Sequence, residues 1–261
     1  MLKGLIAIIF AFGLVAQAEA VKPKEGNSPR RLLYVVQTKG YHHASTETSL
    51  AAVTTLGRNS AAFTTTITDD ASIITADFLR NFDAVMFFTT GELPMNDSQK
   101  KALMDFIKSG KGFIGIHCAT DTFYKWPEYG EMLGGYFAGH PWHQEVTINV
   151  EDPYFPGMNF LGKSFRFKEE IYQYRNWSRD KVHVLLSLDN SSVDISKGRR
   201  ADKDYAIAWC KMHGKGRVLF NGMGHEPEAW NDPRFQRMIF DGIRWAMGDL
   251  PDRVPMEKPS E

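Results

Sequence analysis

The sequence predicts an α/β fold of three layers, α/β/α, in which helices cover both faces of a mostly parallel sheet. Short apolar runs alternate with stretches of helical periodicity between residues 31 and 121, which is the pattern of successive βαβ units. The run Gly112–Ile116 contains only apolar residues and glycine, as expected of a strand that is buried on both faces. Polar loops with histidines follow several of these runs, and ligands bind at this edge of an open α/β sheet.

The first half of the chain is expected to alternate between strands and helices. Strands are expected at Arg31–Gln37, Ala61–Ile67, Asp83–Thr90 and Gly112–Ile116. Helices are expected after Ser45, within Asp69–Asn81 and from Asp97 to Gly110. Ser45 belongs to the residue types that cap helix N-termini, and Glu47 in the first turn favours the helix dipole. The carboxyl ends of these strands should therefore share one edge of the sheet.

The pattern changes after Asp121, and an antiparallel portion is expected to extend the sheet. Phe123–Gly139 is aromatic and glycine-rich, which indicates a short helix followed by a loop. Further strands are expected at Glu145–Val150, Phe165–Tyr174, Val182–Leu188, Tyr205–Met212 and Arg217–Asn221, and a final helix at Asp232–Met247. His213–Gly216 separates the last two strands as a hairpin turn.

Met1–Ala20 is expected to be a secretory signal peptide. Lys3 precedes the apolar run Leu5–Val15, and small residues follow, so that cleavage would fall after Ala18 or Ala20. The mature protein is then expected in the periplasm or outside the cell. An uncleaved anchor is the alternative, although the apolar run is short for a transmembrane helix.

The rest of the chain is expected to form one domain at residues 30–250, with a flexible lead-in at 21–29 and a C-terminal tail at 251–261. The 31 basic and 31 acidic residues balance, so neither nucleic acid nor an anionic membrane surface is expected as a partner. No membrane contact is expected after signal cleavage, and a homodimer stays open. Cys118 and Cys210 lie in or beside apolar runs and are expected to be buried free thiols.

Histidines and carboxylates gather where the expected strands end. The histidines are His42, His43, His117, His140, His143 and His225. The carboxylates are Glu92, Asp121, Glu169, Glu170, Glu226 and Glu228. Together these groups can transfer protons near neutral pH, bind a divalent metal ion such as Zn, Ni, Fe or Mn, or hold a sugar by hydrogen bonds. The residue types leave these three uses open.

Two of these segments resemble class I glutamine amidotransferases. Gly115-Ile116-His117 at the end of a strand is similar to the nucleophile elbow of those enzymes, and Gly224-His225-Glu226-Pro227-Glu228 is similar to their His-Pro-Glu segment. The alignment puts His117 rather than Cys118 at the nucleophile position, and Ala119 replaces the glycine expected two residues later. The resemblance therefore implies the elbow geometry but not a working glutamine amidotransferase.

The complete set of motifs is identified as that of the ThuA-like (trehalose utilisation) family, a branch of the class I glutamine amidotransferase-like, flavodoxin-like fold. The motifs are Gly40-Tyr41-His42-His43, Gly115-Ile116-His117 through Asp121, Trp126-Pro127-x-Tyr129, Gly134-Gly135-x-Phe137-x-x-His140-Pro141, Glu170-x-Tyr172 and Gly224-His225-x-Pro227-Glu228-Ala229-Trp230. They extend from Arg31 to about Asp249. The resemblance implies carbohydrate metabolism, with disaccharides oxidised to 3-keto-glycosides as substrates and no nucleotide cofactor.

A 3-keto-glycoside suits this set of groups because its ketone acidifies the proton at C2. A base can remove that proton, and an electrophile or a metal ion must stabilise the enediolate. The catalytic candidates are His117, Glu170, His225 and Asp121. The candidates for binding the sugar are Tyr41, His42, Glu92, Trp126, Tyr172 and Glu228, and the candidates for metal binding are His43, His143 and His140.

Three functions stay open on this basis. The first is an exported lyase, hydrolase or isomerase that acts on keto-sugars, with or without a metal ion. The second is a non-catalytic carbohydrate-binding module, which the aromatic segment Phe123–Trp142 would favour. The third is a thiol hydrolase or amidotransferase that uses Cys118. Asp121 has a simpler alternative role as the cap of the turn that follows it.

Overall fold

The computed structural model describes residues 29–253 and 255–256. The expected signal peptide at residues 1–20, nearly all of the lead-in and the end of the tail lie outside the described residues. Within the described part of the chain, no helix has the length and apolar character needed to cross a membrane.

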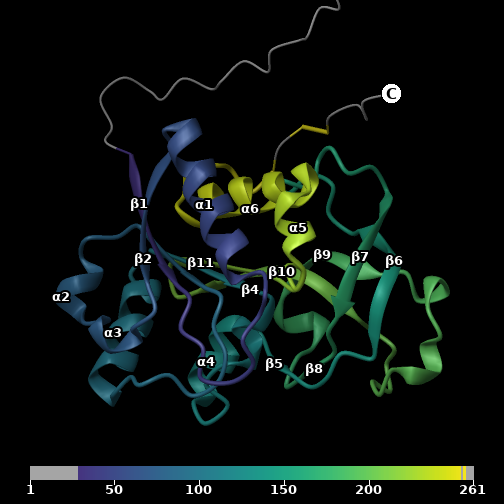
Figure 1. Ribbon diagram of the computed structural model, residues 1–261, viewed down its shortest axis with the longest axis horizontal. Coiled ribbons are helices and arrows are strands. Elements are labelled where there is room, and N and C mark those ends of the chain that lie inside the picture. The colour runs from purple at the N-terminus through teal and green to yellow at the C-terminus, as the bar shows by residue number, and fades with distance from the viewer. Residues whose placement is uncertain (1–28, 254, 257–261) are drawn as a thin grey trace, which may run out of the picture.

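Strands and helices alternate through the first half of the molecule, and strands dominate the second half (Figure 1). The strands are β1 Arg30–Val35, β2 Phe63–Thr68, β3 Ala84–Phe87, β4 Gly112–Ile116, β5 Tyr136–Phe137, β6 Trp142–Val150, β7 Ser164–Ile171, β8 Tyr174–Arg175, β9 His183–Leu188, β10 Ala206–His213 and β11 Gly216–Asn221. The helices are α1 Thr46–Ser60, α2 Ala76–Leu79, α3 Asp97–Lys108, α4 Pro127–Leu133, α5 Pro227–Asn231 and α6 Pro233–Ala246. Short 3₁₀ turns include η1 Ala71–Ile73 and η2 His117–Asp121.

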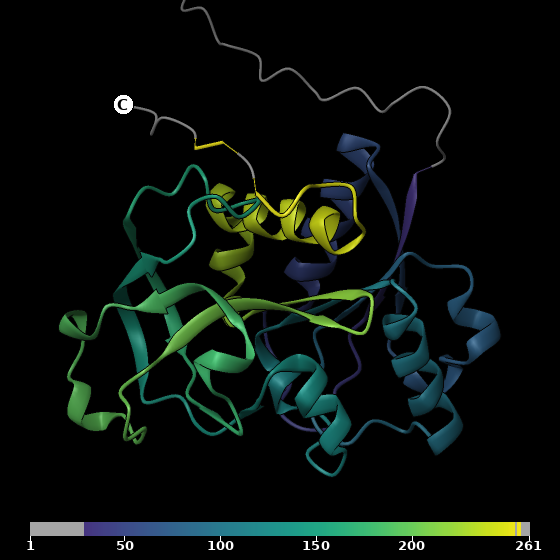
Figure 2. The same ribbon diagram turned by 180° about the vertical axis from the view of Figure 1, so that it is seen from behind.

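Over the described residues, nine strands form one mixed sheet in the order β2-β1-β3-β4-β11-β10-β9-β6-β7. The strands β2, β1, β3, β4 and β11 pair in parallel, whereas β10, β9, β6 and β7 continue the sheet antiparallel. The parallel part has the flavodoxin-like order, with β11 as its fifth strand. Figure 2 shows the antiparallel extension from behind. The predicted α/β fold with an added antiparallel portion is confirmed.

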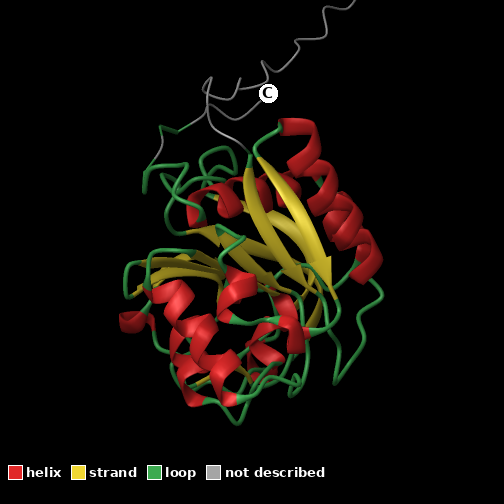
Figure 3. Cartoon of the chain, turned by 90° about the vertical axis from the view of Figure 1, so that its left-hand side faces the viewer, coloured by secondary structure: helices red, strands yellow, loops and turns green. Residues whose placement is uncertain are grey.

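Helices lie on both faces of the sheet (Figure 3). An apolar core fills the space between the sheet and each layer of helices. Successive side chains of a strand point to opposite faces. Leu32 and Tyr34 of β1 therefore join the core that contains Val53 of α1, while Leu33 joins the core that contains Leu103 of α3. Helices α1, α5 and α6 cover the first face, and α2, α3 and α4 cover the second, so β4 in the middle is buried along its whole length.

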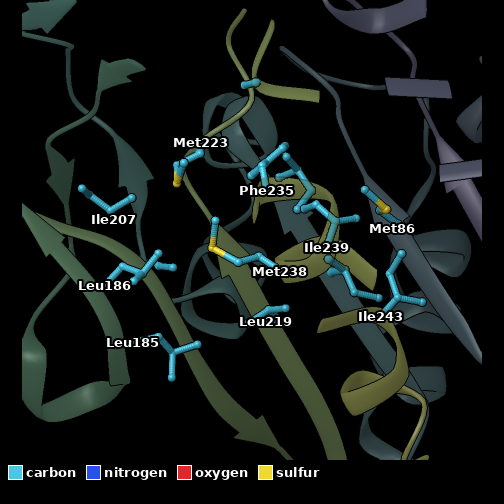
Figure 4. Close-up of a cluster of buried hydrophobic side chains, with 14 of the residues drawn as sticks. Met86, Leu185, Leu186, Ile207, Leu219, Met223, Phe235, Met238, Ile239 and Ile243 are labelled. Carbon is cyan, nitrogen blue, oxygen red and sulfur yellow. The ribbon is translucent and has the colours of Figure 1, made fainter. Parts of the chain in front are cut away.

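Helix α6 closes one face of the parallel strands. Asp232 caps its N-terminus by accepting a hydrogen bond from the backbone N–H of Arg234, and Pro233 occupies the first turn. Its buried apolar side chains lie between the helix and the sheet, near Leu219 of β11 (Figure 4), and include Phe235, Met238, Ile239 and Ile243. Burial of each such side chain contributes about 1.5–3 kcal/mol. The helix expected from the sequence at Asp232–Met247 is thus present with the expected apolar face.

Two expectations about the antiparallel portion were wrong in their boundaries. Strand β6 begins at Trp142 rather than Glu145, so that His143 pairs with Glu170 across the β6–β7 ladder. Strand β7 ends at Ile171 rather than Tyr174, because the next residues turn away and Gln173 exchanges backbone hydrogen bonds with the segment 138–139. The first difference matters for the site, because it fixes His143 beside Glu170.

The N-terminus of α1 also differs from expectation. Ser45 occupies the N-cap position, but its side chain does not cap the helix. Its hydroxyl donates instead to the carbonyl oxygen of Gly224 at 2.9 Å. This long-range bond outcompetes the local cap and ties the loop after β1 to the loop after β11.

Candidate active site

A strained turn at the end of β4 aims His117 into the molecule. His117 has φ 44°, in the left-handed region that non-glycine residues rarely adopt. A β-carbon at Gly115 would lie 2.8 Å from Leu133 Cδ1 and 3.1 Å from Ala119 Cβ, so only glycine lets the chain fold back this tightly. Such a conformation costs roughly 1–3 kcal/mol and persists only where surrounding contacts hold it. The turn therefore has the geometry of an elbow, with an imidazole at its tip.

The environment of His117 selects one tautomer of its ring. The side chain is fully buried, and Nδ1 lies 2.8 Å from the carbonyl oxygen of Gly222. Because a carbonyl oxygen only accepts, Nδ1 carries the proton and donates it. Nε2 then faces Nδ1 of His225 at 3.2 Å and Oε2 of Glu170 at 3.5 Å.

Glu170 of β7 is the carboxylate at the centre of the cluster. Its side chain is buried, with Oε2 3.0 Å from His225 Nδ1 and Oε1 3.1 Å from His140 Nδ1. Burial raises the pKa of Glu170, but its interactions with the imidazoles of His117 and His225 outweigh burial and hold that pKa well below its ordinary value. Burial lowers the pKa of His225, but the bond to Glu170 outweighs it and leaves that pKa raised. Each partner thus favours the charged form of the other.

Glu169 holds the loop that presents His225. Its fully buried carboxylate accepts the backbone N–H groups of Gly224 at 2.8 Å, His225 at 3.1 Å and Glu170 at 2.9 Å. Burial, the largest influence, raises the pKa of Glu169. Gly224 has φ 115°, a conformation that suits glycine. The position of His225 is therefore set by hydrogen bonds from its loop backbone to a side chain of β7.

His43 and Tyr41 border the cluster from the loop after β1. The His43 ring lies 4.9 Å from that of His117 and 5.2 Å from that of His225. Burial, reinforced by the neighbouring imidazoles, lowers the pKa of His43 to about 3, so its ring is neutral. The Tyr41 ring lies 4.8 Å from His43 and is 62% exposed. Tyr41 therefore offers an aromatic face to solvent directly beside the cluster.

A second imidazole–carboxylate pair faces solvent at the same place. His143 Nε2 lies 2.7 Å from Oε1 of Glu226, and the His143 ring is 5.0 Å from that of His225. The His143 side chain is 40% exposed. This pair stands between the buried groups and the solvent, so it can meet a bound molecule.

The structure brings together most of the site residues expected from the sequence. One set of contacts joins Tyr41, His43, His117, His140, His143, Glu170, Tyr172 and His225. The Tyr172 ring lies 4.3 Å from that of His117 and covers it from the side of β5. His42 and Glu228 are exposed side chains on the loops that carry His43 and His225.

Three expected site residues have structural partners elsewhere. The Asp121 carboxylate accepts the hydroxyl hydrogen of Tyr124, which leaves it outside the imidazole contacts. Glu92 accepts the backbone N–H of Lys125 at 3.0 Å. Trp126 is buried in the second apolar core, its ring 5.1 Å from that of Phe123. These contacts give each side chain an internal partner, and the catalytic or sugar-binding roles expected for these residues stay predictions.

Two residues of the site received no role from the sequence. Glu169 was named among the carboxylates of this region without a role, because its partners are backbone N–H groups of a distant loop. Glu226 also received no role, because the role was assigned to its neighbour His225. The sequence offered one signal for both residues, which is that Glu169 and Glu226 each lie next to a residue that was assigned a role.

Cys118 follows the elbow residue directly but does not reach the cluster. It is 1% exposed and belongs to the same apolar core as Tyr34. Burial raises its pKa well above the ordinary thiol value, so the nucleophilic thiolate is disfavoured. Cys118 and Cys210 are both free and buried, as expected from the sequence.

In the described part of the chain, overlapping groups of side chains at this site could hold a metal ion. The first is His43, His117 and His225, and the second is His143, Glu170 and His225. In each group the candidate ligand atoms lie within 4.8 Å of one another. Of the metal-binding candidates expected from the sequence, His43 and His143 fall in different groups, each with His225, and His140 belongs to neither group.

Flavodoxin-like strand order and an elbow that carries histidine define an α/β protein whose reactive groups are imidazoles and carboxylates. The sequence profile of the ThuA family, described as trehalose utilisation, matches residues 31–246. The chain belongs to this family. A comparison with curated proteins finds no match.

Solved structures share the fold over most of the chain. A ThuA-like protein from Bacteroides uniformis has a TM-score of 0.69 and 23% identity, covering 86% of this chain and 94% of its own. A ThuA-like protein from Parabacteroides merdae has a TM-score of 0.71 and 16% identity, covering 89% and 95%. A cytoplasmic protein from Salmonella typhimurium has a TM-score of 0.57 and 9% identity, covering 83% and 99%. At these identities the likeness concerns the fold alone.

Proposed function

We propose that the protein is an enzyme of carbohydrate catabolism that moves a proton next to the carbonyl group of a 3-keto-glycoside. The observation that carries this proposal is the arrangement of two kinds of group at one edge of the sheet. Glu170 is buried with His117 and His225, while the His143–Glu226 pair faces solvent beside them. Family membership supports a sugar substrate, because the family is described as trehalose utilisation.

The chemistry we propose begins at C2 of the keto-sugar. His143, oriented by Glu226, accepts the C2 proton, because it is exposed and its carboxylate partner is separate from the buried Glu170. The negative charge moves to the C3 oxygen, where the buried groups face it. The C1–O bond then breaks and the departing oxygen takes a proton, which gives an unsaturated keto-sugar and a free alcohol. Return of the proton to another carbon would instead give an isomer.

The surroundings of the cluster suit a sugar ring. Tyr41 presents its exposed aromatic face, and such faces pack against the C–H side of sugars while polar groups bind the hydroxyls. We also propose that the protein acts outside the cytoplasm, because Met1–Ala20 has the pattern of a signal peptide. Fractionation of cells that express the full chain would contradict export if the protein stays in the cytoplasm with Met1–Ala20 attached.

The test is turnover of a 3-keto-disaccharide in D₂O, followed by NMR of the products and of deuterium at C2. We expect His143→Asn to lower kcat by about 10²–10⁴-fold, the usual contribution of a positioned base. His183→Asn is the matched control, because His183 makes a similar 2.8 Å contact with Asp152 on another part of the sheet. Absence of turnover and of C2 exchange in the wild-type protein would refute the proposal, as would an equal loss in both variants.

A non-catalytic carbohydrate-binding protein is the second candidate function. The exposed Tyr41 ring favours it, since a stacking surface is sufficient for binding. Calorimetry with the same 3-keto-disaccharide separates the two functions. Saturable binding that Tyr41→Ala abolishes, with no product and no C2 exchange over hours, would support binding alone.

A further inference from the structure

We propose that His117, His225 and Glu170 form a divalent metal site whose open side chelates two neighbouring oxygens of the sugar. The metal site stands on the geometry of these three residues alone. Chelation of the ketone oxygen and an adjacent hydroxyl oxygen rests on the proposed function.

The three candidate ligand atoms already have the spacing of a coordination shell. His117 Nε2 and His225 Nδ1 are 3.2 Å apart, His225 Nδ1 and Glu170 Oε2 are 3.0 Å apart, and Glu170 Oε2 and His117 Nε2 are 3.5 Å apart. Ligands at about 2.1 Å from a metal are ~3.0 Å apart at octahedral angles and ~3.4 Å apart at tetrahedral angles. One ion can therefore touch all three atoms with little movement of the side chains.

Protons alone satisfy this triangle poorly. His117 donates its Nδ1 proton to Gly222, so its Nε2 offers a lone pair in the neutral ring. Glu170 Oε2 is an acceptor as well. A proton on His225 Nδ1 lies between these two acceptors and can point well at only one of them. A cation at the centre of the triangle would satisfy all three atoms at once.

Each of the three residues also has a partner that holds it in place. The Gly222 carbonyl fixes the tautomer and the ring of His117. Glu169 binds the backbone N–H of His225, and the second oxygen of Glu170 contacts His140 at 3.1 Å. Metal-binding histidines and carboxylates ordinarily have such supports, which orient them and raise their basicity. The Gly222 carbonyl and the buried Glu169 carboxylate hold the two imidazoles, while the exposed His140 contacts Glu170 from the solvent side.

Two histidines and one carboxylate leave coordination positions open. Such a set suits Mn, Fe, Co, Ni or Zn, whereas Mg and Ca prefer sites made of oxygen atoms. His43 and His143 flank the triangle, each with a ring nitrogen within 4.8 Å of ligand atoms of the cluster. The exposed Tyr41 ring marks the side from which a sugar would approach. A ketone oxygen and its neighbouring hydroxyl oxygen would occupy two open positions and bring C2 near His143.

The test begins with direct metal binding by the purified protein. The chelator-treated protein is titrated with Co²⁺ and with Zn²⁺, and visible absorption, bound metal and thermal unfolding are followed. We expect one equivalent to bind, with d–d bands for Co²⁺ and a higher Tm. Loss of a residue that only supports a ligand typically weakens metal binding by about 10–100-fold. Glu170→Gln and His225→Asn change the ligands themselves, so we expect them to weaken binding by at least that much. His183→Asn, which alters the unrelated His183–Asp152 pair, should bind as the wild type does.

The outcomes separate this inference from the proposed function. Failure of the folded wild-type protein to take up either metal would overturn the inference, as would equal weakening by His183→Asn, which would indicate adventitious binding. Turnover of the keto-sugar that persists after chelation would also overturn it, while leaving the proposed function intact. One bound equivalent that depends on Glu170 and His225, without any turnover, would support the metal site and overturn the function.

Discussion

One carboxylate with a lowered pKa lies at the amino edge of the parallel strands and another lies beside their carboxyl edge, but their surroundings differ. At the amino edge, Asp83 accepts hydrogen bonds from Lys111 Nζ and from the Arg31 backbone N–H, both at 2.9 Å. At the carboxyl edge, Glu170 is surrounded by imidazoles, whose lone pairs remain available. A lysine ammonium and a backbone N–H are donors without a free lone pair, so they stabilise the carboxylate and leave nothing to react. Imidazole partners stabilise the charge and keep the capacity to bind a metal or move a proton.

The largest effect expected from this comparison concerns activity. Glu170→Gln should lower keto-sugar turnover by at least about 10²-fold, because it removes the charge that organises the imidazoles. Asp83→Asn, the matched change at the amino edge, should leave kcat and KM within about twofold of the wild type, since it lies at the opposite edge from the site. Steady-state kinetics of both variants measure these effects. Equal losses of turnover in the two variants would contradict the difference between the two edges.

Alanine substitutions at the two ends of β4 test the difference between the two edges in a second way. A β-carbon at Gly112 would lie 2.6 Å from the backbone oxygen of Ala246, and one at Gly115 would lie 2.8 Å from Leu133 Cδ1. Each alanine should destabilise the fold by about 1–3 kcal/mol through overpacking. Gly115→Ala should also disturb the His117 elbow and lower turnover measured well below Tm, whereas Gly112→Ala should not.

Urea unfolding and kinetics at low temperature measure the two quantities separately. A loss of stability in both variants with unchanged turnover in Gly115→Ala would show that the elbow does not depend on close packing at this glycine.

The smallest expected effect is the pH dependence that Asp83 gives to the free energy of unfolding. Burial raises its pKa, but the bonds from Lys111 and Arg31 outweigh burial, so the folded pKa lies below the unfolded value of about 3.9. Its contribution is therefore fully present above that unfolded pKa and is lost as the pH falls through the folded pKa. Because the Lys111 side chain is 40% exposed, the contribution should stay below about 1 kcal/mol. Urea unfolding of Asp83→Asn from pH 7 to pH 3 should show a flatter profile, and an unchanged profile would contradict this assignment.

Patterns that act locally predicted the fold well. The apolar run Gly112–Ile116 indicated a buried central strand, and the apolar face of Asp232–Met247 indicated the helix that covers it. Caps were less predictable, because Ser45 uses its hydroxyl for the distant Gly224 carbonyl. A residue type can indicate the ability to cap, but the competing partner appears only when the chain has folded.

The site was predictable where its residues follow strands and unpredictable where they lie within them. His43, His117 and His225 were found because the carboxyl ends of parallel strands share one edge. Glu169 was not assigned, because its three backbone partners come from a loop more than fifty residues away and from its own neighbour. Trp126 was assigned to the sugar because an aromatic side chain in a loop can either bind a ligand or pack internally, and the structure shows that it packs.

The position of Glu170 in the antiparallel extension has a consequence for the order in which reactivity arises during synthesis. A growing chain that has emerged only as far as Val150 possesses His43, His117 and His143, together with four strands of the parallel layer. It lacks both Glu170 and His225, so it has neither the central carboxylate nor the imidazole that links the two groups. The chemistry proposed for this centre therefore requires the final third of the chain, so we expect an unfinished polypeptide to be inactive.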